Sequence, residues 1–325
     1  MPNSESRRNV TSATPSTRTP PAILLMGPTA SGKTGIAVEL ARRFPVELVN
    51  VDSAQIYRHM DIGTAKPDRA LLERAPHHLI DILDPTERYS AGRFCEDASQ
   101  LLAQIHARGR VPLLVGGTML YFKALKEGLS RLPAADADIR LVIDAMAAES
   151  GWPALHAELE RVDPGTASRT QSNDAQRIQR ALEVYYITGQ PLSELIAHSR
   201  SGGAPYRMIA VALELSERRR LHERIAQRFE TMLELGLIGE VRRLRERFDL
   251  NPSLPSMRAV GYRQVWQYLD GELSLGTLRE QAVAATRQLA KRQLTWLRGW
   301  DGAERFDCLG DDLTERVVEH VGSRL

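Results

Sequence analysis

Short apolar runs alternate with helical periodicity in the first third of the chain. Ala22–Met26 is followed by a helical pattern through Arg43, and Val46–Val51 forms a second apolar run. A helical pattern at about 91–107 then leads to a third apolar run, Val111–Val115. Strand, helix and strand in alternation predict a parallel α/β sheet with flanking helices. Because ligands bind beyond the carboxyl ends of such strands, the residues that follow these runs should share one site.

The hydrophobic pattern changes to continuous helix after residue 131. Asn173 and Asp174 can cap a helix that continues through Ile187 and stops at Gly189. The apolar run Met208–Leu213 then predicts a return to strand. We therefore expect the chain to divide into four parts. Residues 1–21 form a disordered tail, 22–131 the first part of an α/β core, 132–203 a helical insertion, and 204–325 the continuation of the core with C-terminal helices. Long helical patterns at 216–248 and 279–298 belong to the last part.

Composition narrows the class of protein without choosing a function. The 325 residues are 42% hydrophobic and 26% charged, which is ordinary for a globular chain. No apolar run approaches the length of a membrane span, so we expect no membrane partner. We also expect a monomer located in the cytoplasm. Two cysteines, Cys95 and Cys308, cannot build a disulfide framework and indicate a reducing compartment. The formal charge of +2 means that any nucleic-acid contact must rest on local clusters.

The clearest chemical signal is a complete phosphate-binding loop directly after the first apolar run. It comprises Gly27, Pro28, Thr29, Ala30, Ser31, Gly32, Lys33 and Thr34, in the pattern G-x-x-x-x-G-K-[ST]. Between a strand and a helix, the backbone amides of such a loop converge on an anion. Lys33 would add a point charge, and the Thr34 hydroxyl is placed to hold Mg²⁺. The chain therefore has a P-loop-type fold and binds a diphosphate or polyphosphate.

Asp52 ends the second strand, beside the expected position of this loop. Its carboxylate could act as a general base, associate with a metal ion, or cap the next helix. The following Ser53, Ala54 and Gln55 include short polar side chains that can read the edge of a base.

Thr118 ends the third strand, where many phosphate-loop hydrolases place an acidic metal ligand. A hydroxyl at this point disfavours an ATPase. Thr118 could donate to a phosphate oxygen or act only as a strand-end cap.

Three stretches without acidic residues stand out against the nearly neutral total charge. Arginine and glutamine suit phosphate and base contacts, and aromatic rings stack on unpaired bases, although each patch alone could be a solvated helix face. The stretches are Gln176, Arg177, Ile178, Gln179 and Arg180; Arg258, Ala259, Val260, Gly261, Tyr262 and Arg263; and Lys291, Arg292, Gln293, Leu294, Thr295, Trp296, Leu297 and Arg298. Together they indicate RNA binding.

Arg224 and Arg228 lie one helical turn apart in a pattern where arginine and glutamate interleave. On charge pattern alone they could form solvent-facing ion pairs.

Together these motifs resemble the bacterial tRNA dimethylallyltransferases, the isopentenyl-tRNA transferase family. The resemblance covers about residues 22–300, without departure from the family pattern in its motifs. It rests on Gly27–Thr34, Asp52–Tyr57, Asp61–Pro67, Leu113–Tyr121, Gln176–Arg180, Arg258–Arg263 and Gln288–Trp300.

The resemblance implies transfer of a dimethylallyl group from its diphosphate to the exocyclic amine of the adenine 3′ to the anticodon. It makes Asp52 the base and Thr118 a second catalytic residue, with Thr118 and Arg228 as diphosphate contacts and Mg²⁺ as cofactor. It implies tRNA contacts for the three patches, for Arg140, and for Asp52–Gln55 with Thr118. The adenine must be extruded from its stack to reach the donor. A phosphate-loop small-molecule kinase and a non-catalytic RNA-binding module remain the alternatives.

Overall fold

A computed structural model describes residues 19–130, 132–198 and 202–325. Most of the predicted disordered tail therefore lies outside the described residues. Its last residue, Pro21, is already part of the first strand, where it pairs with Arg207. The strand thus begins one residue earlier than the apolar run predicts.

The described residues form a six-stranded parallel sheet in the order β3-β2-β4-β1-β5-β6. The predicted parallel α/β fold is confirmed. Helices cover both faces of the sheet, so its central strands are apolar almost throughout. The strands are β1 Pro21–Met26, β2 Val46–Val51, β3 His77–His78, β4 Val111–Gly116, β5 Arg207–Glu214 and β6 Glu304–Asp307.

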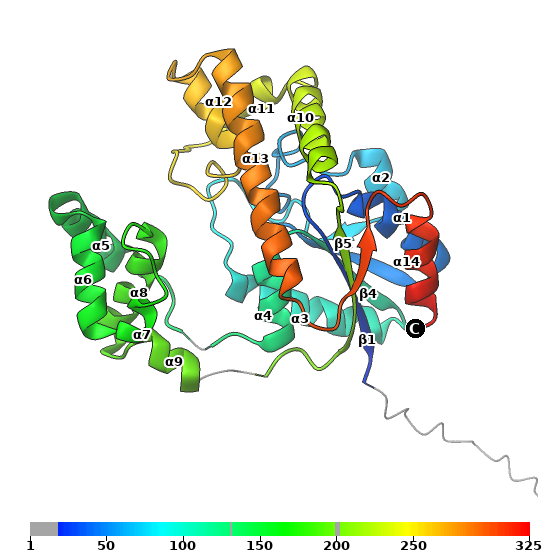
Figure 1. The fold of residues 1–325 in the computed structure, drawn as a ribbon, viewed down its shortest axis with the longest axis horizontal. Coiled ribbons are helices and arrows are strands. Elements are labelled where there is room, and N and C mark those ends of the chain that lie inside the picture. The colour runs from blue at the N-terminus through cyan, green and yellow to red at the C-terminus, as the bar shows by residue number, and fades with distance from the viewer. Residues whose placement is uncertain (1–18, 131, 199–201) are drawn as a thin grey trace, which may run out of the picture.

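Two helical layers enclose the sheet (Figure 1). On one face, Phe94 of α3 and Phe122 of α4 pack against Leu24 of β1. On the other face, Leu40 of α1 and Val317 of α14 join a second apolar cluster. The helices of the core are α1 Lys33–Arg43, α2 Arg69–Arg74, α3 Ala91–Ala107, α4 Met119–Glu127 and α14 Leu313–Gly322.

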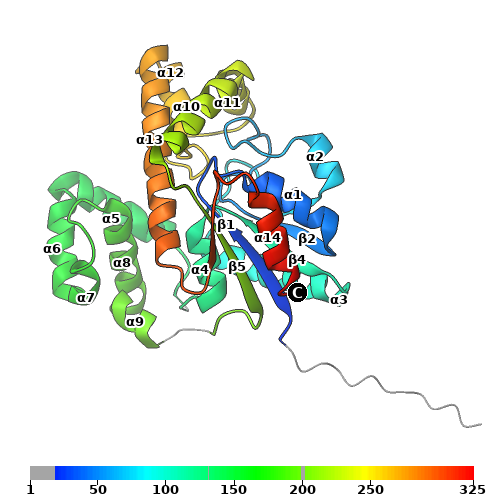
Figure 2. The ribbon, with the colours of Figure 1, turned by 45° about the vertical axis from the view of Figure 1, so that its right-hand side comes forward.

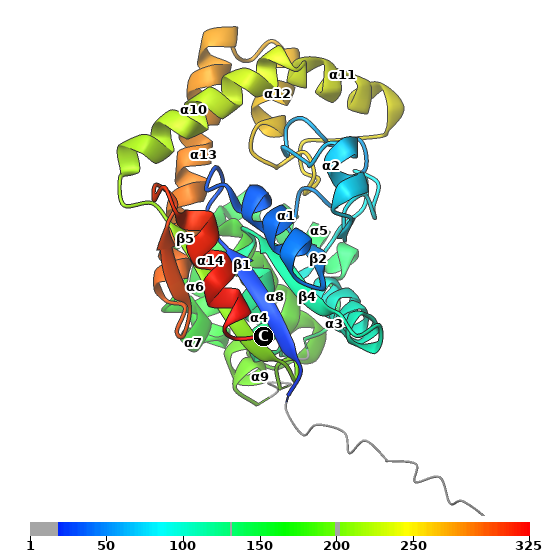
Figure 3. The ribbon, with the colours of Figure 1, turned by 90° about the vertical axis from the view of Figure 1, so that its right-hand side faces the viewer.

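A group of C-terminal helices lies above the carboxyl ends of the strands (Figure 3). It comprises α10 Arg218–Glu234, α11 Leu237–Arg247, α12 Tyr262–Leu269 and the upper part of α13 Leu275–Arg298. Phe229 of α10 and Tyr262 of α12 share an apolar cluster with Tyr57 and Met60, from the loop after β2. This packing closes the end of the sheet at which the phosphate loop and Asp52 emerge.

Five helices form a lobe beside this core (Figures 1 and 2). They are α5 Ala137–Ser150, α6 Trp152–Val162, α7 Pro164–Ala167, α8 Ala175–Thr188 and α9 Leu192–His198. The lobe has an apolar cluster of its own, built around Ile143, Leu159, Ile178 and Leu182. Residues 131 and 199–201, near the predicted ends of the insertion, lie outside the described residues. The predicted boundaries stay predictions.

The chain segment that returns from the lobe passes against the segment that leaves for it. The amide of Ala204 donates to the carbonyl of Leu125 at 2.9 Å. A Cβ at Gly203 would lie 1.8 Å from the carbonyl oxygen of Lys126, so only glycine allows this approach. The two connections of the lobe therefore meet at the end of α4.

The C-terminal part of the chain differs most from the sequence prediction. The pattern at 216–248 forms two helices, because Leu235 and Gly236 interrupt it and Gly236 has a φ of 95°. The last long helix begins at Leu275, capped by Ser274, rather than at residue 279. Strands β3 and β6 have no counterpart in the prediction, because they have only two and four residues. Helix α14 also has no counterpart among the predicted helices.

Candidate active site

The phosphate loop joins β1 to α1 in a tight turn. Ala30 has a φ of 62° and Gly32 a φ of 83°, and Gly32 occupies the cap position of α1. A Cβ at Gly27 would lie 2.8 Å from Ser31 Oγ, which explains a glycine at the start of the turn. The helix N-terminus and its unpaired amides thus face the carboxyl end of the sheet, as an anion site requires.

Lys33 folds back over the loop that precedes it. Its Nζ donates to the carbonyl oxygens of Gly27 at 2.9 Å and Pro28 at 2.7 Å. The pKa of Lys33 is lowered to about 8, chiefly by burial; the charge of Asp52 opposes this shift and that of Arg228 adds to it. The protein alone therefore stabilises the charged form of Lys33 only in part. A negatively charged ligand at this point would stabilise that form further.

A cavity of about 380 Å³ opens at the carboxyl end of the sheet. One side is polar and carries the phosphate loop, Asp52 and Gln55. Apolar side chains from α10, α13 and the segment before α12 also line the cavity, and Arg228 lies on α10 among them. These apolar lining residues are Ile225, Phe229, Met232, Ala259, Val260 and Leu289. The cavity therefore suits a ligand with a charged end and a hydrocarbon end.

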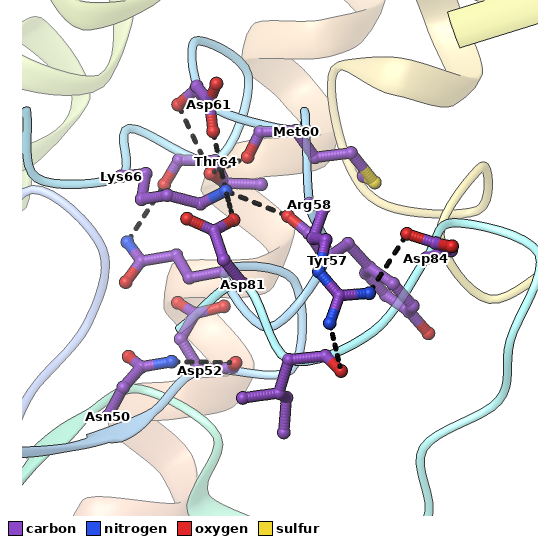
Figure 4. Close-up of polar contacts among 12 residues, drawn as sticks. Asn50, Asp52, Tyr57, Arg58, Met60, Asp61, Thr64, Lys66, Asp81 and Asp84 are labelled. Carbon is purple, nitrogen blue, oxygen red and sulfur yellow. Dashed lines mark hydrogen bonds and ion pairs between the residues drawn. The ribbon is translucent and has the colours of Figure 1, made fainter. Parts of the chain in front are cut away.

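Asp52 forms a cap, one of the roles that the sequence left open, with only one of its two oxygens (Figure 4). Its Oδ1 accepts the amide of Ala54 at 2.9 Å, as in a turn cap. Among the described residues, Oδ2 accepts no hydrogen bond. The buried Asn50 side chain donates to the backbone carbonyls of Asp52, at 3.4 Å, and Leu79, at 3.1 Å. One carboxylate oxygen is thus fixed while the other is available to a ligand.

Arg228 reaches the same cavity from α10. Within the described part of the chain it forms no hydrogen bond or ion pair, whereas Arg219 of the same helix pairs with Glu223 at 2.9 Å. Burial lowers the pKa of Arg228, and the nearby charge of Asp52 opposes this effect. The structure thus places Arg228 at the cavity instead of in a solvent-facing pair, while Arg224 does not line the cavity.

Thr118 holds a neighbouring loop instead of lining the cavity. Its Oγ1 accepts the amide of Ser53 at 3.0 Å and contacts Ser53 Oγ at 3.4 Å. Its own amide donates to the carbonyl of Val51. Thr118 therefore connects the carboxyl ends of β2 and β4. Neither Thr118 nor Ser53 is among the residues that line the cavity.

Gln293, one of the predicted tRNA contacts, is a buried structural support that also lines the cavity. It is buried in α13, where its Oε1 accepts the amide of Thr29 at 2.9 Å. Its Nε2 donates to the carbonyl of Gly117 at 3.0 Å. A Cβ at Gly117 would lie 2.3 Å from this Nε2, so the glycine makes room for the amide. Gln293 joins the phosphate loop to the end of β4.

The rest of the 291–298 stretch divides between surface and core. Lys291, Arg292, Thr295, Trp296 and Arg298 are exposed, Leu294 is half-buried and Leu297 is buried. Trp296 is 40% exposed, and the Lys123 ammonium lies 5.6 Å from its ring centroid. The exposed members keep the basic and aromatic character that indicated RNA.

The 176–180 stretch is more constrained than its charge suggests. Glu183, fully buried in α8, accepts two hydrogen bonds from Arg140 and one from Arg180, at 2.6–3.0 Å. Arg180 also donates to the carbonyl of Pro133 at 2.7 Å. Both predicted tRNA contacts, Arg140 and Arg180, thus already serve the fold of the lobe. The Arg140–Glu183 pair spans 43 residues and gives no local signal, whereas Arg180 and Glu183 lie one helical turn apart.

Arg177 and Gln176 are the exposed members of this stretch. The Arg177 side chain is 68% exposed, with only a 3.4 Å contact to Asp174. Ile178 is part of the lobe's apolar cluster, and Gln179 donates to Asp144 at 2.6 Å.

The 258–263 stretch also divides into surface and interior. Arg258 and Arg263 are exposed, whereas Tyr262 is buried. Ala259, Val260 and Gly261 line the cavity.

A cleft of about 630 Å³ brings two of the stretches together. It lies between the lobe and the loop before α12, and its polar residues include three arginines. They are Arg88, Arg140 and Arg258, together with Gln176, Gln179 and Ser253. Residues distant in sequence thus form one basic surface next to the active-site cavity.

A buried lysine organises the loop after β2 (Figure 4). The side chain of Lys66 is only 3% exposed and pairs with Asp61 and Asp81, each at 2.6 Å. It also donates to the carbonyl of Tyr57 at 2.8 Å. This network gives the Asp61–Pro67 motif a structural reason.

The described residues offer little for a preformed metal site. Within 19–130, 132–198 and 202–325, no group of three His, Cys, Asp or Glu side chains could hold a metal ion. Thr34, the predicted Mg²⁺ ligand, is exposed in the first turn of α1. Over the same ranges, no helix is long and apolar enough to cross a membrane.

Comparisons with known proteins agree with this site. The model of the IPP transferase family matches residues 55–300, and that of isopentenyl transferase matches residues 21–83. A tRNA dimethylallyltransferase of Nitrosomonas europaea is 58% identical, covering 94% of this chain and 97% of the relative. One of Thiobacillus denitrificans is 59% identical over the same shares.

Solved structures have the same fold. The full-length tRNA isopentenylpyrophosphate transferase of Bacillus halodurans matches with a TM-score of 0.69 and 36% identity, over 94% of this chain and 97% of that one. A eukaryotic dimethylallyltransferase acting on tRNA matches with a TM-score of 0.76 and 25% identity, over 94% and 80%. A phosphate loop facing a carboxylate across a half-apolar cavity defines a transferase that uses a diphosphate. The chain belongs to the IPP transferase family.

The pKa of Lys33 gives a test of the anion site. The ammonium is charged below a pKa of about 8 and loses its charge as the pH rises through that value. Affinity for inorganic pyrophosphate should therefore fall between pH 7 and 9 by up to about tenfold relative to Lys33→Arg, whose charge persists. Calorimetric titration of both proteins measures the ratio, and a ratio independent of pH contradicts the prediction.

Proposed function

We propose that this protein transfers a dimethylallyl group from dimethylallyl diphosphate to the exocyclic amine of the adenine 3′ to the anticodon of tRNA. The observation that carries the proposal is the cavity that Lys33, Arg228 and a free oxygen of Asp52 share with apolar side chains of α10 and α13. The names of the relatives support it. We further propose a monomer that works where tRNA is found, in the cytoplasm.

The polar end of the cavity would hold the diphosphate. The loop amides, Lys33 and Arg228 offer donors and positive charge to an anion that becomes more negative as it leaves. The Thr34 hydroxyl is a hard oxygen donor of the kind that Mg²⁺ accepts alongside phosphate oxygens. Bound there, the ion would neutralise part of the leaving group's charge.

The apolar side chains of α10 and α13 would hold the isoprenoid chain. Phe229 and Met232 of α10 and Leu289 of α13 offer hydrocarbon contacts but no hydrogen-bond partners. A branched five-carbon group gains free energy from this burial, at about 0.8 kcal/mol for each buried CH₂. A phosphoacceptor metabolite of a kinase gains nothing comparable.

Asp52 would receive the proton that the reaction releases. The nitrogen lone pair of the amine forms a bond to the allylic carbon, and the bond from that carbon to the diphosphate oxygen breaks. The electron pair of the broken bond leaves with the diphosphate, and the amine proton passes to Asp52 Oδ2. Because Oδ1 is held by Ala54, the free oxygen keeps its direction.

The cleft between the lobe and the loop before α12 would bind the tRNA. Arg88, Arg258 and Gln176 line it, and Arg177 is exposed on α8. These side chains can contact phosphates of an anticodon stem-loop, which fixes its orientation without reading sequence. Arg140 and Arg180 contribute through Glu183, by holding the lobe in shape.

Two other functions make opposite predictions for one experiment. A kinase would turn over ATP, and a non-catalytic RNA-binding module would turn over nothing. Wild-type protein with labelled dimethylallyl diphosphate, Mg²⁺ and unmodified tRNA should place label in the tRNA, whereas ATP should not be hydrolysed in the presence of tRNA. ATP turnover with phosphoryl transfer to a metabolite would replace the proposal with the kinase.

Asp52→Asn separates the base from the cap. The substitution preserves the oxygen that accepts the Ala54 amide and removes the proton acceptor. We expect kcat to fall by about 10²–10⁴-fold, with tRNA affinity and thermal unfolding close to wild type. Asp68→Asn is the matched control, because Asp68 caps α2 through the Leu71 amide, away from the cavity. Equal rates for both variants, or rescue of Asp52→Asn by excess Mg²⁺, would remove the base role.

Replacing exposed arginines at the cleft tests the tRNA surface. Arg177→Ala with Arg258→Ala should weaken tRNA binding most at low salt, with a smaller difference from wild type as the salt concentration rises. Each lost phosphate contact lowers the slope of log affinity against log salt by about one. Arg161→Ala is the control, since the Arg161 side chain is 73% exposed on α6 and does not line the cleft. A salt slope that is unchanged in the double variant would place both arginines outside the interface.

A further inference from the structure

A carboxylate outside the cavity is buried without a cationic partner. Glu240 of α11 is 4% exposed, and among the described residues it forms no ion pair. Its Oε2 accepts the amides of Asp61 at 3.0 Å and Ile62 at 2.8 Å. Its Oε1 accepts the amide of Gly63 at 3.2 Å and the hydroxyl of Tyr262 at 2.5 Å. A buried charge of this kind needs such compensation.

The hydrogen bonds of Glu240 differ from those of a glutamate on the exposed surface of a helix. Three consecutive backbone amides converge on one carboxylate, and such a concave group of amides binds anions. Hydrogen bonds to a charged acceptor are about twice as strong as those between neutral groups. The negative charge of Glu240 therefore fixes the 61–63 backbone on α11.

The same carboxylate reaches the segment before α12 through Tyr262. The ring of Tyr262 packs directly on the 61–63 backbone, since a Cβ at Gly63 would lie 2.5 Å from it. The neighbouring Glu240 charge and burial both raise the pKa of Tyr262, so the phenol stays a donor. Loop and segment are thus held against each other by one acceptor.

Both structures that Glu240 joins form walls of the active-site cavity. Gly63, Thr64 and Ala65 line it from one side, and residues 259–261 line it from another, while Glu240 itself does not line it. The carbonyls of Thr64 and Ala65 accept the side-chain amide of Gln55, at 3.2 and 3.4 Å. Gln55 lies in the turn that begins at Asp52.

We propose that Glu240 is a positioning residue for the acceptor side of the reaction. It sets the distance between the 63–65 and 259–261 walls, and through Gln55 it sets the turn that carries Asp52. This role rests on the proposed function, because the adenine is the group that these walls would enclose. Glu240 acts on the reaction only through the residues that it holds.

The hydrogen bonds that hold the phosphate end of the cavity do not include Glu240. The phosphate loop is held by Gln293 of α13, and Arg228 belongs to α10. Loss of the Glu240 carboxylate should therefore affect the acceptor and leave the diphosphate end in place. If Glu240 contributed only to the stability of the fold, its loss would not affect the acceptor while leaving the diphosphate end unchanged.

Glu240→Gln tests the division at nearly constant volume. The neutral amide has one acceptor oxygen where the carboxylate has two, and its NH₂ opposes a donor. We expect kcat to fall by at least about tenfold, since a displacement of 1 Å can cost about 10²-fold. The KM for dimethylallyl diphosphate should stay within about twofold of wild type. Glu246→Gln is the control, because Glu246 is exposed on the same helix.

Hydrogen exchange supplies a readout that does not depend on activity. In Glu240→Gln the amides of 61–63 should exchange faster, while those of the phosphate loop keep wild-type protection. Tyr262→Phe removes one donor and leaves the three amides bound to Glu240. It should show a smaller loss of kcat and tests the same connection if Glu240→Gln folds poorly.

The outcomes separate this role from the proposed function. A wild-type protein that transfers no prenyl group overturns the proposed function. An active wild type, with unchanged kcat and exchange in Glu240→Gln, overturns only the role of Glu240. Faster exchange throughout the protein, or equal changes in kcat and in the KM for dimethylallyl diphosphate, would also overturn it, because stability alone explains such results.

Discussion

Three charged side chains share one partly buried cavity, and the charge of each bears on the others. Asp52 favours the charged forms of Lys33 and Arg228, while burial disfavours both. A parallel sheet allows this arrangement, because β1 and β2 end at the same edge and α10 crosses above it. The single negative charge of Asp52 does not compensate the two positive charges of Lys33 and Arg228 in this cavity. A ligand with negative charge completes the balance, and this requirement directs the choice of substrate class.

The parts of the fold that repeat a simple period could be predicted from the sequence. Apolar runs long enough to cross the sheet identified β1, β2, β4 and β5, and the phosphate loop with Asp52 followed from their ends. Short elements could not be predicted, since the four residues of β6 have polar neighbours and a single buried phenylalanine, Phe306. The break between α10 and α11 depends on one glycine with positive φ, inside a pattern that otherwise stays helical.

The site was harder to predict than the fold, because exposure depends on which side chains and backbone groups each residue meets in the folded chain, some close in sequence and some far away. A run of basic residues looks uniform in sequence, yet Arg177 is solvent-facing and Arg180 is bound to Glu183. Gln293 belongs to an apparent RNA patch but supports Thr29, 264 residues earlier. Glu240 gave no signal at all, since its partners are backbone amides, which every sequence has. Local composition identifies candidate chemistry, and only tertiary contacts divide it between ligand and fold.

The meeting of the two lobe connections at the end of α4 has a consequence for the architecture of this family. A segment that leaves and returns at neighbouring points closes a loop whose entropic cost grows only slowly with its length. The core can therefore accept a longer, shorter or rearranged lobe without changing a single strand of the sheet. Acceptor recognition and donor chemistry then become separately variable parts of one chain. Under the proposed function, a change of RNA target would need new residues in the cleft that the lobe forms with the loop before α12, while Lys33 and Asp52 would keep their places.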